Sequence, residues 1–380
     1  MKRIIALDIA RGLAIVGTLA TNIWIFSHPE GMLGYLNHPT STGAPPAAQA
    51  TEALLQQFAN GKFLGLLTLL FGIGLAIQYE SAQRRDTPWP RSYGIRAAIL
   101  FADALLHYLL VVEFDILMGY AITGIAVAYV LQLSQRWQRR ILVVAGAIHL
   151  CLVGAITAAL WNSPMVSFTL PSNPYRDGTW WDLVLLRIDL GVLFRFEPVF
   201  IFWLGVFMFL SGAWLYRSGI FDDRGGDLRR ALMRLGAGAF VLDMAAGLAH
   251  PGLSFVTRYC TAPMVAFGLL AWVAHTWGGQ APGFWARRCA EIGRVALSAY
   301  ILQNLIASAL FYGWGCNLGS LITDLRLPVT VAAWCGISAL LAALAHVWLR
   351  HFSRGPFEWL WNKTARAFMR APLRPQRVNA

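Results

Sequence analysis

Hydrophobic segments long enough to cross a bilayer as helices recur along the whole chain, separated by short polar connections. A transmembrane helix needs about 20 predominantly apolar residues, within a range of about 17–25. This periodic pattern predicts an all-α, polytopic integral membrane helix bundle. The ten predicted spans lie at residues 4–26, 61–79, 96–112, 115–133, 141–161, 197–216, 232–249, 259–277, 294–313 and 328–349.

Basic residues concentrate on alternate connections between these spans. One set contains Lys2/Arg3, Arg84/Arg85/Arg91, Arg136/Arg139/Arg140, Arg217/Arg224/Arg229/Arg230, Arg287/Arg288 and the tail from Arg350 to Arg377. The other set holds only Arg176, Arg187, Arg195, Arg258 and Arg326. Cytoplasmic connections of membrane proteins carry the excess of Lys and Arg. We therefore expect an even number of spans, both termini in the cytoplasm, and a multi-pass protein of a bacterial inner membrane.

Composition agrees with a membrane protein. The 380 residues are 57% hydrophobic and 13% charged, and the mean hydropathy is +0.54. The formal net charge of +12 does not predict nucleic-acid binding, because the basic residues are spread over short loops. The five cysteines are scattered without metal-ligand spacing, so we expect no metal.

The first span carries polar residues that a simple membrane anchor lacks. Asp8, Arg11 and Asn22 interrupt its apolar run, and no small-residue cleavage site follows, so we expect an uncleaved helix. On a helix, Arg11, Thr18 and Asn22 share one narrow stripe, with Asp8 about 60° to the side. An Asp8–Arg11 packing pair and a functional site are both consistent with this pattern, because a charge facing lipid is costly.

The third span brings an acid and an imidazole together. Asp103 and His107 lie four residues apart, so the carboxylate can orient the imidazole. Glu113 and Asp115 follow at the outer turn. An intramembrane Asp–His pair is either a functional site or a device that holds helices together.

Further polar residues extend this set of candidates. Lys62 opens the second span on the outer side, where His28, Glu113 and Asp115 are also expected. Lys62 either pairs with these acids or extends its ammonium to the headgroups. In the ninth span Tyr300, Gln303 and Asn304 are polar, as is Asp243 in the seventh. Inter-helix hydrogen bonding is the alternative to a binding role for these.

The spans and their connections suggest three regions. Residues 1–161 form an N-terminal helix bundle, residues 162–196 an outer connection, and residues 197–380 a C-terminal bundle with a basic tail. Within the outer connection, residues 180–196 predict an interfacial helix, with a re-entrant segment as the alternative. Residues 28–60 predict an outer loop. After Gly355-Pro356, Trp359 and Trp361 predict a short helix at the inner headgroups.

Several ordered blocks resemble bacterial membrane proteins of the YeiB-like family, whose C-terminal half is a domain of unknown function. The blocks are R-I-I-A-L-D-I-A-R-G-L-A-I-V-G-T-L-A-T-N, F-A-N-G-K-F-L-G-L-L-T-L-L-F-G-I-G-L, L-L-H-Y-L-L-V-V-E-F-D-I-L-M-G-Y-A-I-T-G, A-L-S-A-Y-I-L-Q-N and F-S-R-G-P-F-E-W-L-W. Two departures are local: Phe114 stands where the family often has Gly, and the second span is rich in Leu where Ser is common.

The resemblance extends to membrane acyltransferases of the heparan-alpha-glucosaminide N-acetyltransferase type and to bacterial O-acetyltransferases. It implies an acyl donor such as acetyl-CoA, held from the cytoplasmic side near Asp8 and Arg11. The O-acetyltransferases carry a basic residue and a His separated by ten residues in their first helix, and here that spacing joins Arg11 to Asn22. A base would therefore have to be His107, with Asp103 or Asp115 behind it, and Asn22 would donate a hydrogen bond to developing negative charge.

The acceptor in this hypothesis is a cell-envelope glycan, a lipid or a small metabolite. It would approach from the outer side near Asn22, His28, Lys62 and His107. The main alternative is a transporter or lipid-handling protein that uses the same intramembrane Asp, Arg and His. A non-catalytic membrane partner and a homo-oligomer also remain open.

Overall fold

A computed structural model describes residues 3–161, 171–322 and 325–370, and every regular element within them is a helix. Each of the ten predicted spans coincides with a helix, so the helical part of the prediction is confirmed. These helices are α1 (Ile5–Phe26), α4 (Lys62–Arg84), α5 (Arg91–Leu110), α6 (Leu117–Val130), α7 (Gln135–Trp161), α11 (Phe202–Arg217), α12 (Gly226–Ala249), α14 (Ala262–Trp277), α16 (Ala296–Phe311) and α18 (Arg326–His351).

Length and apolar character mark the chain as a membrane protein. Among the described residues, seven helices are long and apolar enough to cross a bilayer. The number rises to nine if two bent pairs each count as one span. Helix α6, with 14 residues, is shorter than a typical span. Ten crossings and cytoplasmic termini therefore stay predictions.

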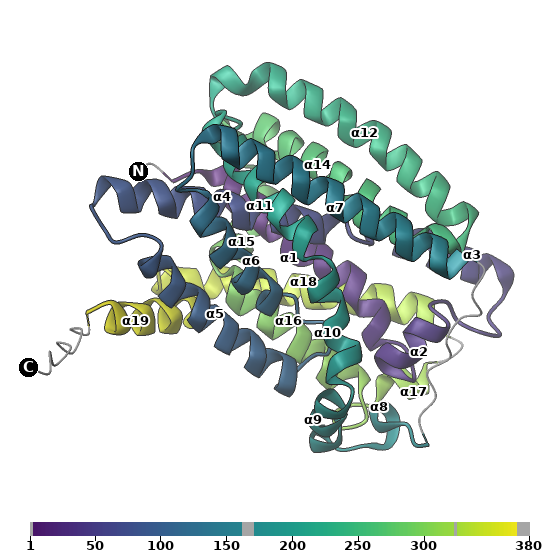
Figure 1. Cartoon of the computed structure of the whole chain (residues 1–380). Helices are drawn as coiled ribbons and strands as arrows, with labels where there is room; N and C mark the ends of the chain where they lie inside the picture. The colour runs from purple at the N-terminus through teal and green to yellow at the C-terminus, as the bar shows by residue number, and fades with distance from the viewer. Residues whose placement is uncertain (1–2, 162–170, 323–324, 371–380) are drawn as a thin grey trace, which may run out of the picture.

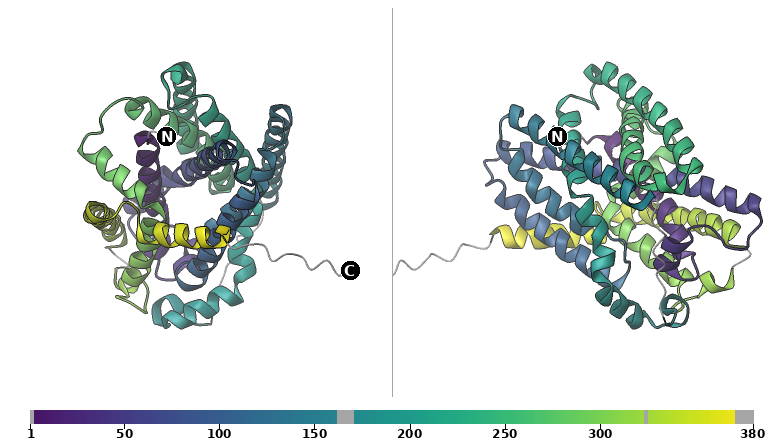
Figure 2. Two further views of the ribbon diagram at one scale, coloured as in Figure 1. Left: turned by 90° about the vertical axis from the view of Figure 1, so that its left-hand side faces the viewer. Right: turned by 45° about the vertical axis from the view of Figure 1, so that its right-hand side comes forward.

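Both ends of the described chain lie at the same end of the bundle, at the left in Figure 1. We call this the basic end, since Arg84, Arg91, Arg139 and Arg217 stand there at helix ends. The C-terminal helix α19 (Pro356–Arg370) lies across it, as the left view of Figure 2 shows. The predicted short tail helix is thus confirmed.

Short helices cover the opposite end of the bundle. The expectation of an outer loop at residues 28–60 is wrong, because this segment contains α2 and α3. Pro46 begins the α3 helix, where its missing N–H costs no hydrogen bond, and an Ala/Gln-rich run then favours the helical state. The short helices here are α2 (Gly31–Asn37), α3 (Pro46–Ala59), α8 (Pro174–Asp177), α9 (Trp180–Asp189), α10 (Gly191–Phe200) and α17 (Leu318–Leu321).

The outer connection at 162–196 is only partly described, because residues 162–170 lie outside the described ranges. Its remainder is helical from Pro174 onward. Thr179 and Asp182 form a reciprocal capping box at the start of α9, which satisfies two N–H groups that a helix start leaves free. The helix in this segment is confirmed, whereas its placement in the membrane interface stays a prediction.

The first helix lies at the centre of the bundle and packs against α4, α15 (Phe284–Arg294) and α16. Glycines permit the closest of these approaches. A Cβ on Gly12 would lie 1.8 Å from the Cys289 carbonyl oxygen, and one on Gly293 would lie 1.9 Å from that of Asp8. Without a side chain at either position the two backbones touch directly.

A sharp bend separates α15 from α16, at an angle of 92°. Glu358 of α19 satisfies the backbone N–H groups exposed at this break: its Oε1 accepts from Leu297 at 2.7 Å and from Ser298 at 3.3 Å. The Ser298 hydroxyl donates to Oε2 at 2.5 Å. A carboxylate at a helix N-terminus also interacts favourably with the helix dipole. The tail helix is thereby fixed to the bundle.

The remaining short elements are η1 (Asp223–Gly225), η2 (Pro251–Leu253), α13 (Ser254–Val256) and η3 (Thr257–Thr261).

Candidate functional site

A cavity of about 330 Å³ lies between α1, α4, α5 and α16, and α19 forms part of its wall. Its volume falls within the range of small-molecule pockets. Most of the lining is apolar, with polar groups concentrated towards the basic end. The polar and glycine residues of the lining are Arg11, Gly74, Gln78, Tyr93, Arg96, Gly293, Arg294, Tyr300, Glu358 and Asn362.

Three guanidinium groups line the cavity at the basic end, from Arg11, Arg96 and Arg294. Arg11 lies 3.6 Å from the Asp8 carboxylate, and that carboxylate also accepts from Arg3 at 2.5 Å. The predicted Asp8–Arg11 pair is therefore present. Because Asp8 is shared between two arginines, the lining keeps an excess of positive charge, which suits an anionic ligand.

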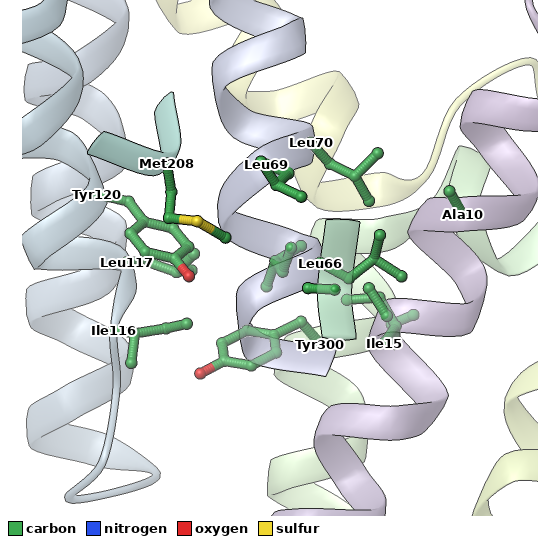
Figure 3. Close-up of a cluster of buried hydrophobic side chains, with 14 of the residues drawn as sticks. Ala10, Ile15, Leu66, Leu69, Leu70, Ile116, Leu117, Tyr120, Met208 and Tyr300 are labelled. Atoms are coloured by element: carbon green, nitrogen blue, oxygen red, sulfur yellow. The ribbon is translucent and has the colours of Figure 1, made fainter. Parts of the chain in front are cut away.

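Tyr300 closes the inner end of the cavity. Its side chain extends from α16 towards Ile116, while Ile15 and Leu66 pack around it (Figure 3). The Tyr300 ring is 97% buried, and its centroid lies 5.2 Å from that of the His107 imidazole. His107 is thus one aromatic side chain beyond the cavity.

A buried hydrogen-bonded chain surrounds His107. Its Nδ1 lies 2.7 Å from Asp115 Oδ2, and its Nε2 lies 3.4 Å from the Asn304 amide nitrogen. An ionised carboxylate only accepts, so Nδ1 donates to Asp115 and Nε2 carries the lone pair. Asp115 is fixed in turn, because its Oδ1 accepts from the Leu117 backbone at 2.9 Å. Asn304 Oδ1 is buried without a partner in the described structure.

Asp115, rather than Asp103, is the partner of His107. Asp103 lies in the same helix as His107, but its Oδ2 is buried without a hydrogen bond. No hydrogen bond joins Asp103 to His107 in the described part of the chain. The spacing of four residues allows such a contact on a helix, yet the imidazole turns to the carboxylate after the helix end. Sequence spacing could not choose between the two acids.

Two arginines that the sequence analysis left without a role hold the segment that carries Asp115. Arg187 of α9 donates to Glu113 Oε1 at 3.1 Å and to the backbone carbonyl oxygens of Leu109 and Val111. Arg195 of α10 donates to the carbonyl oxygens of Asp115, at 2.8 Å, and Glu113. The sequence signal for both residues was a charge in an otherwise apolar helical run. Their partners, about 70–80 positions away, were not readable from the sequence.

Glu113 lies in a second buried group beside this segment. Its carboxylate is fully buried, and the Tyr175 hydroxyl lies beside it. The Tyr312 hydroxyl is buried without a partner in the described structure, and its ring lies 5.1 Å from that of Tyr175. Unpaired buried polar atoms are rare in proteins and indicate a place where water or a ligand is bound.

Lys62 belongs to a different cluster. It pairs with Asp243, which also accepts from the Gln57 amide at 2.8 Å and from the Thr261 hydroxyl at 2.6 Å. The structure therefore does not bring Lys62 to Glu113 or Asp115. Lys62 is the first residue of α4, which packs against α14. Helix α14 in turn packs against α12, the helix that carries Asp243. Asp243 thus holds helices together, which agrees with the inter-helix hydrogen bonding that the sequence offered as one of its two roles.

The remaining candidates are Gln303, Asn22 and His28. Gln303 donates to the Thr18 hydroxyl at 3.4 Å, so Thr18 of the predicted stripe on α1 faces α16. Asn22, on the same stripe, is half-buried. His28 lies in the turn between α1 and α2, where its Nδ1 accepts from the Glu30 backbone at 3.1 Å. Burial, with the nearby charge of Arg326, lowers the pKa of His28 to about 4, so it is neutral at pH 7.

Comparisons with known proteins agree with the resemblance noted in the sequence. Residues 215–367 match the family model "Protein of unknown function (DUF418)". The chain is 28% identical to "Uncharacterized protein YeiB" of Escherichia coli, over 96% of each chain. It is 25% identical to "Uncharacterized protein YxaH" of Bacillus subtilis, over 95% of this chain and 93% of the relative. These matches support a YeiB-like family.

A third relative, "Uncharacterized 39.9 kDa protein in amylase 3'region" of Bacillus acidopullulyticus, is 25% identical over 95% of this chain and 93% of its own. No solved structure matches the chain significantly. The YeiB-like similarity therefore spans nearly the whole chain. It carries no activity with it, because none of these names specifies one, and the link to acyltransferases stays a hypothesis.

Proposed function

We propose that this protein is an acyltransferase of the bacterial inner membrane. The observation that carries the proposal is the position of the cavity: arginines line it at the basic end, and its inner wall, Tyr300, contacts the His107 ring. An anionic acyl thioester such as acetyl-CoA fits this order of groups. Its phosphates would meet the guanidiniums, and its narrow acyl arm would enter the apolar part.

The positive-inside rule places the basic end in the cytoplasm, where acyl-CoA is the expected donor. Arg11, Arg96 and Arg294 would bind the phosphate-bearing part at the mouth. The nucleotide itself would stay outside, since about 330 Å³ accommodates the arm and the acyl group. A small movement of the Tyr300 ring would then bring the thioester carbonyl within reach of His107.

His107 would act as general base through Nε2. Its Nδ1–H bond to Asp115 fixes the ring orientation and stabilises the imidazolium that forms. The acceptor oxygen or nitrogen would attack the thioester carbonyl carbon while Nε2 takes its proton. The C–S bond then breaks, and the thiolate leaves towards the basic end and recovers that proton. The Asn304 amide, 3.4 Å from Nε2, can donate to the developing oxyanion. Asn304 thus replaces Asn22 in the role that the sequence suggested.

Transport is the second candidate, because the cavity has arginines at one end and the buried His107–Asp115 pair beyond the other. A protein that alternates between two faces has such a cavity in each of its end states. In that case the His107–Asp115 pair would carry a proton rather than activate an acceptor. The two proposals differ in one product, because only acyl transfer releases free thiol from the donor.

The test uses the full chain in liposomes with acetyl-labelled CoA and an extract of envelope lipids and glycans. We expect transfer of label, together with release of thiol, and a loss of at least about 100-fold in His107→Gln. His149→Gln is the matched control, since His149 is also buried but bonds only the Tyr259 carbonyl oxygen, at 3.0 Å. Transfer that survives in His107→Gln contradicts the role of the base. No transfer by the wild-type protein, combined with solute flux, supports transport instead.

A further inference from the structure

A second recess lies at the basic end, between α7 and α11. It measures about 280 Å³, and we call it the α7–α11 groove. Helix α7 packs mainly on α11, and little of its apolar window is buried, so the groove opens towards the surrounding lipid. Its lining residues are Gln135, Gln138, Arg139 and Leu142 on one side, and Leu210, Trp214, Arg217 and Ser218 on the other.

The groove is polar at one end and apolar at the other. Arg139 and Arg217 stand at the basic end, and Leu142 is one turn further along α7. Helix α11 runs in the opposite direction, so Leu210 lies seven residues before Arg217, about 10 Å deeper in the bundle. One helical turn further still, the Phe207 ring lies 3.2 Å from the Cβ position of Gly146 and closes the groove.

The charges of the groove are positive, and one of its two arginines has an acid nearby. Arg217 donates to Gln138 at 3.0 Å and lies 4.0 Å from Glu80. Arg139 is exposed, and Arg140 next to it stacks over the Trp137 ring at 4.8 Å. No acid is among the eight lining residues. The groove therefore offers guanidinium groups to a phosphate, and no carboxylate to the ammonium group of a zwitterionic headgroup.

We propose that the α7–α11 groove binds one anionic phospholipid. The phosphodiester would lie between Arg139 and Arg217, with the Gln135 and Gln138 amides able to bond the headgroup. One acyl chain would follow Leu142, Leu210 and Trp214 into the bilayer. Basic recesses between transmembrane helices on the cytoplasmic side are suited to such headgroups, and the aromatic rings at this level are suited to the membrane interface.

The site is independent of the proposed acyl transfer, because no residue of the groove lines the first cavity. In this proposal the α7–α11 contact binds a lipid in addition to packing the two helices together. The groove leaves about 280 Å³ between the two helices at the basic end, the level at which a lipid headgroup would lie. A bound lipid would therefore join a peripheral helix to the rest of the bundle.

The experiment titrates the purified full-length protein with lipid and counts bound molecules by native mass spectrometry. The probes are phosphatidylglycerol, phosphatidylcholine and inorganic phosphate. We expect one saturable phosphatidylglycerol site, at least about fivefold tighter than phosphatidylcholine, and no displacement by phosphate. Arg139→Gln combined with Arg217→Gln should weaken phosphatidylglycerol binding at least about tenfold.

The matched control removes the same charge elsewhere at the basic end. Arg224→Gln combined with Arg230→Gln changes two exposed arginines outside the groove, and binding should stay within about twofold of the wild type. Arg139→Gln alone serves if the loss of Arg217 disturbs folding, because Arg139 is exposed. Equal loss in the control pair would reduce the effect to net charge and overturn the site. Unchanged binding in both groove variants, or displacement by inorganic phosphate, would overturn the lipid assignment.

Discussion

Two buried ionic clusters in the same bundle differ in what surrounds them. In the Lys62–Asp243 cluster both carboxylate oxygens accept from side chains, namely those of Lys62, Gln57 and Thr261, and neither charged residue lines a described cavity. In the His107–Asp115 cluster the neighbouring Asn304 Oδ1 is unpaired, and a cavity of about 330 Å³ ends one ring away.

This difference distinguishes the Lys62–Asp243 cluster, which packs helices together, from the His107–Asp115 cluster, which is a candidate functional site. A polar group fully paired by its neighbours contributes to the association of helices and has no capacity left for a ligand. A pair beside a cavity, with an unpaired acceptor next to it, retains that capacity. Charge within a span was therefore insufficient to identify function; free hydrogen-bonding capacity next to a cavity identifies the better candidate.

The largest expected effect is on the stability of the paired cluster. Lys62→Ala leaves Asp243 buried without its cation, so we expect a loss of about 3–5 kcal/mol in unfolding free energy. Removing both charges, as Lys62→Met with Asp243→Leu, should recover most of that loss. Unfolding in detergent, followed by circular dichroism, measures both variants. A Lys62→Ala protein as stable as the wild type contradicts the packing role of this pair.

A smaller loss is expected where α19 is fixed to the bundle. Glu358→Ala removes the acceptor for the Leu297 and Ser298 N–H groups at the start of α16, and losing such a cap costs about 0.5–2 kcal/mol. Asp227→Asn is the matched control, because Asp227 lies in the first turn of α12 without capping it. Thermal unfolding should separate the two variants. Equal melting temperatures would show that the Glu358 contact does not stabilise the break.

His107→Gln should be mild for stability and severe for function. A Gln amide can still donate to Asp115, so we expect about 1 kcal/mol of destabilisation, the net value of one hydrogen bond. This is well below the loss in Lys62→Ala, which is the contrast between the two clusters. The same unfolding assay measures it. A loss as large as that of Lys62→Ala would place His107 among the packing groups.

A pH dependence of stability is expected outside the spans. The pKa of His28 is lowered from about 6.5 to about 4 by burial and by Arg326, so between these values the unfolded chain binds more protons than the folded one. Stability should therefore fall as pH falls through that window, because protonation also removes the acceptor for the Glu30 N–H. Unfolding temperatures from pH 7 to pH 4 test this, with His28→Asn expected to flatten the profile. An identical slope in the variant assigns the dependence to other groups.

The positions of the helices could be predicted from the sequence, but the pairing of polar side chains on different helices could not. Apolar length located the ten helices that coincide with predicted spans, because burying backbone in lipid or in protein requires helical pairing. Residues 28–60 were misread, since Pro, Gly and Ala are compatible with both a loop and the helices that form there. Helical spacing put Arg11, Thr18 and Asn22 on one stripe, because it depends on a single helix, but it did not name Gln303 as the partner of Thr18.

Contacts between distant segments were the part that could not be read. Lys62 meets Asp243 across 181 positions, and Arg187 meets Glu113 across 74. Which acid pairs with which base depends on helix order in space, and a single sequence does not contain it. The choice between Asp103 and Asp115 as the partner of His107 stayed open for the same reason, because it depends on how the segment after α5 turns back.

Filling the cavity tests the central claim most directly. A Cβ on Gly74 meets only the Arg11 guanidinium, at 3.9 Å, so Gly74→Leu projects into the cavity without a backbone clash. Gly154→Leu is the control, because a Cβ there meets nothing within 4 Å on α7. The measurement is equilibrium binding of labelled acetyl-CoA to the reconstituted protein. We predict at least a tenfold loss (about 1.4 kcal/mol) in Gly74→Leu and none in Gly154→Leu, whereas wild-type affinity in Gly74→Leu would contradict the account.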